Sequence, residues 1–173
     1  MSRTLVLGGS RSGKSAYAES LLADRPDVTY LATSVVDADD AEWAQRVAAH
    51  RVRRPASWTT LETTRPSDLL RPGAFLVDSV TTWVAALMDE TGVWDDAEGA
   101  TDRLATRCDA LVNAWVMTPA HVVAVSDEVG LGVVPETRSG RHFRDTLGTV
   151  NQRLAATADE VWFVVAGLPQ RLR

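Results

Sequence analysis

The stretch that decides the fold is Gly8-Gly9-Ser10-Arg11-Ser12-Gly13-Lys14-Ser15, near the start of a 173-residue chain. It has the spacing G-x-x-x-x-G-K-S, and it stands between an apolar run, Thr4 to Leu7, and the helix-favouring residues Ala16 to Ala23. Glycines let such a loop wrap tightly enough for successive backbone N–H groups to face phosphate oxygens. The stretch therefore predicts a phosphate-binding loop (P-loop) between a strand and a helix.

The rest of the chain continues the same alternation. Four further apolar runs, rich in β-branched residues, are Val28 to Ala32, Phe75 to Asp78, Val122 to Ser126 and Val161 to Val165. Stretches with helical character separate them, and one spacing, Leu104, Cys108, Leu111 and Trp115, marks the buried face of a helix. We expect an α/β fold of the P-loop, RecA-like kind, with a mainly parallel sheet and helices on both faces.

Length and composition bound the class of protein. At roughly 150 residues per domain, residues 1–173 are expected to form a single P-loop nucleotide-binding domain. A formal net charge of -5 argues against a nucleic-acid partner held by phosphate contacts. No apolar run approaches the roughly 18 residues that span a bilayer, and no secretory segment opens the chain. We therefore expect a cytoplasmic protein with no membrane span.

Two kinds of side chain should complete the P-loop. Lys14 is the only lysine among the 18 lysines and arginines, which suggests a need for an ammonium there; we expect it to be solvated and flexible. Mg²⁺ needs the Ser15 hydroxyl and an acidic residue at the end of a buried strand. Asp78 is the better candidate for that metal ligand, with capping of the next helix as its alternative role. Asp127 is the competing carboxylate.

Residues 127–130, Asp-Glu-Val-Gly, also match the D-x-x-G of signalling GTPases. Those proteins read guanine through a second, lysine-containing motif, which a chain with Lys14 as its only lysine cannot contain. A Ras-like switch is excluded, although binding of guanine nucleotides by other means is not.

A helix predicted between Asp37 and Pro55 carries His50 on its apolar face and three arginines, Arg51, Arg53 and Arg54, near its end. One interpretation is a half-buried histidine beside a solvated basic turn. The other is a phosphate clamp around a nucleophilic imidazole. The spacing does not decide between them.

The two other histidines carry weaker signals. His121 opens a predicted strand and is expected to be structural. His142 lies on a predicted helix with Arg138, Arg141 and Arg144. That basic face is either solvated, or it meets an anionic substrate or another subunit.

Taken in order, the motifs resemble those of the bifunctional adenosylcobinamide kinase / adenosylcobinamide-phosphate guanylyltransferase family. After the P-loop they are Tyr30-Leu31-Ala32-Thr33-Ser34, His50-x-x-x-Arg54-Pro55-x-x-Trp58-x-Thr60-x-Glu62, Asp78-Ser79-Val80-Thr81-Thr82, Glu128-Val129-Gly130-Leu131-Gly132-Val133-Val134-Pro135, and Phe143-Arg144-Asp145-x-x-Gly148-x-x-Asn151. Two departures stand out, since Asp127 and Ala86 occupy places where the family pattern has asparagine.

The resemblance implies two reactions. ATP or GTP phosphorylates adenosylcobinamide, and GMP from GTP then passes through His50 to adenosylcobinamide phosphate. Lys14 is expected to be the second catalytic residue, and Ser15 and Asp78 are expected to bind Mg²⁺. The implied nucleotide site is Gly8, Gly9, Ser10, Arg11, Ser12, Gly13, Lys14, Ser15, Thr33, Ser34, Arg51, Val52, Arg53, Arg54 and Glu62.

The family also implies a homotrimer. Two alternatives to the bifunctional enzyme are a P-loop small-molecule kinase without guanylyl transfer and a RecA-like module that binds nucleotide without catalysis.

Overall fold

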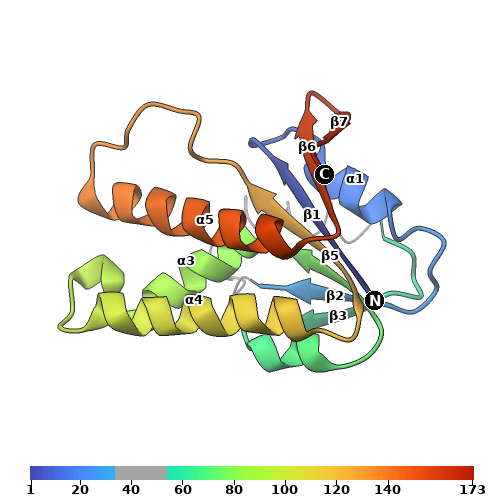
Figure 1. The fold of residues 1–173 in the computed structure, drawn as a ribbon, viewed down its shortest axis with the longest axis horizontal. Coiled ribbons are helices and arrows are strands. Elements are labelled where there is room, and N and C mark those ends of the chain that lie inside the picture. Colours follow the sequence, from blue (N-terminus) through green and yellow to red (C-terminus); the bar gives the residue numbers. More distant parts are fainter. Residues whose placement is uncertain (34–53) are drawn as a thin grey trace.

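The computed structural model describes residues 1–33 and 54–173, and seven strands within these ranges form one sheet (Figure 1). The strands are β1 (Ser2–Gly8), β2 (Val28–Ala32), β3 (Thr59–Glu62), β4 (Ala74–Asp78), β5 (His121–Asp127), β6 (Glu160–Val165) and β7 (Leu168–Arg171). Their order is β3-β2-β4-β5-β1-β6-β7, and each neighbouring pair is parallel except β6 with β7. The predicted mainly parallel sheet is confirmed.

Helices cover both faces of this sheet, as predicted. In Figure 1, α3 (Val80–Thr91), α4 (Ala100–Met117) and α5 (Arg138–Thr157) lie on one side and α1 (Lys14–Ser20) on the other. Two 3₁₀ turns, η1 (Pro66–Leu70) and η2 (Val93–Asp95), connect these elements. None of the helices within the described ranges is long and apolar enough to cross a membrane.

The sheet separates two hydrophobic clusters. Leu5 and Leu7 of β1 join the cluster beneath α3, α4 and α5, whereas Val6 joins the one beneath α1. A strand covered on both faces needs apolar residues at successive positions, which is why these strands read as unbroken apolar runs. The stripe from Leu104 to Trp115 is buried on α4, as its spacing predicted.

The sequence did not predict two of the strands, β3 and β7. Three of the four residues of β3 are exposed, and so are all four residues of β7. Both lie at the edges of the sheet, where one face or both faces stay in water and no apolar run is required.

The register of the parallel strands sets the position of the site. Gly8 lies opposite Asp127, and Ala32 lies opposite both Asp78 and Glu62. The carboxyl ends of the strands therefore share one edge of the sheet, where ligands bind in open α/β folds.

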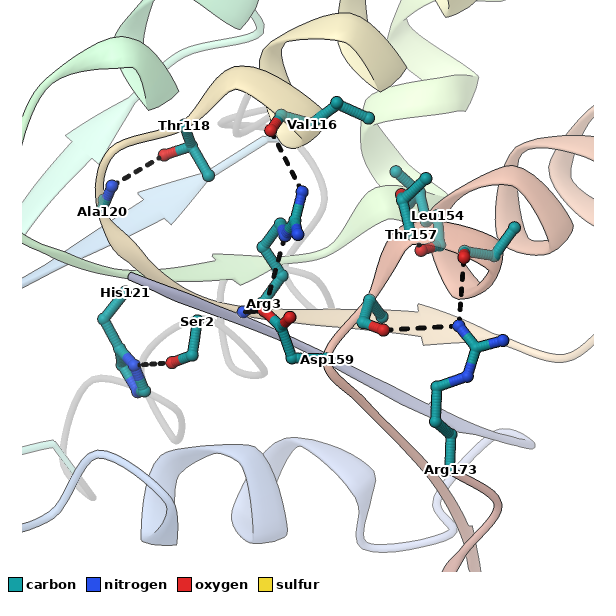
Figure 2. Close-up of polar contacts among 12 residues, drawn as sticks. Ser2, Arg3, Val116, Thr118, Ala120, His121, Leu154, Thr157, Asp159 and Arg173 are labelled. Carbon is teal, nitrogen blue, oxygen red and sulfur yellow. Dashed lines mark hydrogen bonds and ion pairs between the residues drawn. The ribbon is translucent and has the colours of Figure 1, made fainter.

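The opposite edge holds the two ends of the chain (Figure 2). The Ser2 hydroxyl contacts His121 Nδ1, and the Arg3 backbone N–H donates to Asp159 Oδ2 at 2.7 Å. The Arg173 guanidinium donates to the carbonyl of Ala155 at 2.6 Å, near the end of α5. His121 opens β5 and lies in this contact, far from the carboxyl edge, as expected of a structural residue.

Candidate functional site

The P-loop connects β1 to α1 and is packed closely at two glycines. A Cβ on Gly8 would lie 2.5 Å from Ser12 Oγ and 2.6 Å from the Val164 carbonyl. Gly13 has a φ of 94°, and a Cβ there would lie 3.1 Å from the Cα of Gly167. The Gly167 N–H also donates to the Ser12 carbonyl at 2.7 Å, so the turn after β6 supports the loop.

Lys14 is held rather than solvated, which corrects the expectation from the sequence. Its Nζ lies 2.6 Å from Asp127 Oδ1 and donates to the Gly9 carbonyl at 3.2 Å. The Lys14 side chain is only 12% exposed. A triphosphate entering the loop therefore competes with a carboxylate for this ammonium.

Asp127 is fixed through its backbone. Its N–H donates to Thr81 Oγ1 on α3 at 2.8 Å, and its carbonyl accepts from Asn151 Nδ2 on α5 at 3.0 Å. The next N–H, of Glu128, donates to the Gly8 carbonyl at 3.1 Å. With the backbone fixed on three sides, the Asp127 carboxylate is presented to the P-loop.

Asp78 ends β4 and is oriented by a buried tyrosine, Tyr30, which belongs to a family motif but to which the sequence assigned no role. The Tyr30 hydroxyl donates to Asp78 Oδ2 at 2.9 Å, and the Arg54 guanidinium lies over the Tyr30 ring at 3.5 Å from its centroid. Burial and the nearby Asp78 carboxylate raise the pKa of the Tyr30 phenol far above its ordinary value. Tyr30 therefore stays a neutral donor to Asp78 at any physiological pH.

The alternative role for Asp78, as cap of the next helix, is wrong. Ser79 is the N-cap of α3, because its Oγ accepts from the Thr82 N–H at 3.2 Å. The Asp78 carboxylate is thus not used as the cap of α3.

Thr33 lies inside this network. Its hydroxyl donates to the Ser79 carbonyl at 2.6 Å, accepts from the Ser79 N–H at 3.0 Å and contacts the Thr82 hydroxyl at 2.7 Å. Thr33 is fully buried, so it fixes the loop between β4 and α3.

The structure separates the predicted nucleotide residues into two groups. The P-loop follows β1, whereas Arg54 stacks on β2 and Glu62 ends β3. At about 4.8 Å per strand, β3 lies roughly 19 Å from β1 across the sheet and β2 roughly 14 Å. Ser34, His50, Arg51, Val52, Arg53 and most of the helix predicted between Asp37 and Pro55 lie outside the described residues.

The three arginines beside His142 act within the chain. Arg138 pairs with Asp96 at 2.8 Å, Arg141 donates to the Glu136 carbonyl at 2.6 Å, and Arg144 donates to the Gly130 carbonyl at 2.6 Å. These partners lie in loops that the basic pattern of the helix could not reveal.

Ser15 and Asp78 offer the kinds of oxygen donor that suit Mg²⁺. Mg²⁺ in phosphate-transfer sites takes one or two protein carboxylates with substrate phosphates and water. Ser15 supplies a hydroxyl at the start of α1, and Asp78 supplies a carboxylate oriented by Tyr30. Within residues 1–33 and 54–173, no group of three or more His, Cys, Asp or Glu is placed to hold a metal ion.

Comparison with known proteins gives full-length matches. Residues 4–172 match the family described as cobinamide kinase / cobinamide phosphate guanyltransferase. The bifunctional adenosylcobalamin biosynthesis protein CobU of Salmonella typhimurium is 45% identical, and the match covers 98% of each chain. CobU of Escherichia coli is 42% identical over 98% of each chain, and CobP of Pseudomonas aeruginosa is 39% identical over 99% of this chain and 97% of its own.

A solved structure supports the fold class. An ATPase from a type III secretion system of pathogenic bacteria superposes with a TM-score of 0.59 at 12% identity. The match covers 98% of this chain and 56% of that ATPase. Together with the sheet order, this likeness confirms the RecA-like P-loop fold.

Proposed function

The chain belongs to the cobinamide kinase / cobinamide phosphate guanyltransferase family, and from this membership we propose how its residues carry out the two transfers. It is a bifunctional enzyme of cobalamin biosynthesis, as its motifs suggested. The proposal rests above all on the placement of Lys14, held at the carboxyl edge of the sheet within a glycine-rich loop.

The kinase step uses the P-loop. The loop N–H groups bind the triphosphate of ATP or GTP, and Lys14 leaves Asp127 to contact the outer phosphates. The aminopropanol hydroxyl of adenosylcobinamide forms a bond to the γ-phosphorus and gives its proton to solvent, while the bond from that phosphorus to the β,γ-bridging oxygen breaks. Lys14 balances the charge that develops on the departing diphosphate. Bound Mg²⁺, held by Ser15 and Asp78, would supply further charge neutralisation at the phosphate oxygens.

The guanylyl step uses His50. A neutral imidazole nitrogen attacks the α-phosphorus of GTP and pyrophosphate leaves, which gives a guanylyl-histidine. The phosphate of adenosylcobinamide phosphate then displaces the imidazole and yields adenosylcobinamide-GDP. An unperturbed imidazole, with a pKa of about 6.5, is mostly unprotonated at pH 7 and is a competent nucleophile.

We place the two transfers at two positions along the carboxyl edge. Arg51, Arg53 and Arg54, together with Glu62, would serve the GTP that reacts with His50, and the P-loop would serve the phosphoryl donor. Of these residues, Arg54 contacts β2 and Glu62 ends β3, and a separation of roughly 14 to 19 Å across the sheet between these two strands and β1 supports two positions rather than one. The proposal also includes a cytoplasmic location and a homotrimer. A monomer mass from light scattering at micromolar concentrations would contradict the homotrimer.

Labelling with GTP carrying ³²P at the α-phosphate tests the guanylyl step. Wild type should gain protein-bound label that is lost in acid and stable in base, as a phosphoramidate is. His50→Ala should lose the label and guanylyl transfer while it still binds triphosphate, and the matched variant His142→Ala should keep both. Label that persists in His50→Ala would refute the assignment, and kinase activity without any label in wild type would favour a kinase alone.

A further inference from the structure

An exposed apolar segment follows β5, and we call its residues 129–134 the apolar loop. Leu131, Val133 and Val134 are 80%, 95% and 63% exposed, whereas Val129 packs against the core at the base of the loop. Single exposed apolar residues are ordinary on protein surfaces, but three large ones within four consecutive positions mark a binding surface.

Side chains hold the backbone of this segment in place. Arg144 donates to the carbonyls of Gly130 at 2.6 Å and Gly132 at 3.3 Å. Glu128 Oε1 accepts from the Gly130 N–H at 2.6 Å, and Arg141 donates to the Pro135 carbonyl at 3.0 Å. The apolar side chains therefore project from an ordered backbone, and an ordered surface loses less conformational entropy when it binds a ligand.

The apolar loop begins at the phosphate site. Asp127, two residues before it, pairs with Lys14, and the Glu128 N–H donates to the Gly8 carbonyl. From there the chain runs away from the P-loop toward the start of α5 (Figure 1). Leu131 lies within about 14 Å of Asp127, which is the reach of four extended residues.

We propose that the apolar loop binds the corrin ring of the cobinamide acceptor; this inference rests on the proposed function. The acceptor is a macrocycle with a broad, mainly carbon face, and its reacting hydroxyl sits at the end of a flexible arm. Such a molecule needs an apolar platform beside the phosphate site rather than within it, so that the arm alone reaches the γ-phosphate. Residues 129–134 are Val, Gly, Leu, Gly, Val and Val. Because none of these side chains is charged, an apolar face can bind there without removing water from a charged group.

The test pairs a double variant, Leu131→Ser with Val133→Ser, against Met117→Ser. Met117 is 72% exposed and ends α4 just before β5, away from the carboxyl edge. Binding of cobinamide is measured by equilibrium dialysis and read from the visible absorption of the corrin. The KM values for cobinamide and for the triphosphate, GMP labelling without corrinoid, and the mass in solution are measured alongside.

The double variant should bind cobinamide at least tenfold more weakly and raise its KM to match, as loss of two apolar contacts predicts. Its triphosphate KM, GMP labelling and mass should equal those of wild type, as should every value for Met117→Ser. Unchanged cobinamide binding would overturn the inference, as would an equal loss in Met117→Ser. A lower mass for the double variant would overturn it too, because the loop would then be a contact between copies of this chain. Wild type that binds cobinamide without phosphorylating it would instead contradict the proposed kinase function.

Discussion

At the scale of single residues, the two carboxylates at the carboxyl edge have separable roles. Asp127 neutralises Lys14 in the free enzyme, whereas Asp78 is oriented by Tyr30 and is the proposed metal ligand. We expect Asp127→Asn to bind triphosphate about fivefold more tightly without Mg²⁺, since an ion pair of about 1 kcal/mol no longer competes for Lys14. Asp78→Asn should instead raise the Mg²⁺ concentration that gives half-maximal kinase activity. Calorimetric titration and Mg²⁺ activation curves check the pair, and the reverse pattern would make Asp127 the metal ligand.

Tyr30 supports a further prediction at this scale. Tyr30→Phe keeps the ring under Arg54 and removes only the hydroxyl that donates to Asp78. The free energy of unfolding should fall by about 1 kcal/mol, as is usual for one lost hydrogen bond. The Mg²⁺ requirement of the kinase should rise in the same direction as in Asp78→Asn, while the KM for cobinamide stays unchanged. An unaltered Mg²⁺ curve would show that Tyr30 serves packing only.

At the scale of elements, alanine substitutions at two glycines of α5 should change the free energy of unfolding in opposite directions. A Cβ on Gly140 would lie 2.9 Å from Thr137 Oγ1, the cap of the helix, and 3.0 Å from Pro135 Cβ. A Cβ on Gly148 would meet nothing within 4 Å. Gly140→Ala should cost about 1–2 kcal/mol by disturbing the cap, and Gly148→Ala should gain about 0.5–1 kcal/mol from helix propensity. Urea unfolding of both variants measures the difference.

The same pair of variants has a functional readout. Gly140→Ala crowds Pro135, which directly follows the apolar loop, so it should also weaken cobinamide binding. If Gly148→Ala is more stable yet loses activity or changes its mass in solution, then another molecule approaches the backbone at Gly148 too closely for a side chain to fit.

At the scale of the whole molecule, stability should depend on pH through the edge opposite the site. Burial, Arg25 and the N-terminal ammonium lower the pKa of His121 from its ordinary value of 6.5. The unfolded chain therefore binds this proton at higher pH than the folded chain, so the contribution of neutral His121 to stability is complete above pH 6.5 and is lost as pH drops below it. His121→Asn should remove this slope in urea unfolding measured from pH 7.5 to 5, and the matched variant His142→Asn should retain it. Equal slopes in wild type and His121→Asn would contradict the assignment.

A second contact at that edge, between Arg3 and Asp159, is lost at lower pH. The backbone hydrogen bond from Arg3 is the main cause that lowers the pKa of Asp159 from 3.8. Its stabilisation is complete above that ordinary pKa and is lost as pH falls through the lowered value. The edge that holds the two ends of the chain should therefore lose stability in two steps as pH falls, first through His121 and then through Asp159, and hydrogen exchange of the β1 and β6 amides would report both steps.

The sequence by itself determined the parts of this protein that depend on local pattern. The P-loop needs glycines at fixed spacing, the five central strands need apolar residues on both faces, and the buried stripe of α4 repeats with the period of a helix. The edge strands β3 and β7 carry no such pattern, because water covers them. The ordered motifs also identified the family, since their spacing holds from Gly8 to Asn151.

Only the tertiary structure decided which side chains meet. Lys14 pairs with Asp127, 113 positions away, because β1 and β5 are neighbours in a register that sets Gly8 opposite Asp127. Tyr30 reaches Asp78 because β2 pairs with β4. The order and register of parallel strands arise from the packing of the whole sheet, and no local periodicity encodes them. For that reason the sequence could name candidate residues such as Lys14 and Asp78 but not the side chains that contact them.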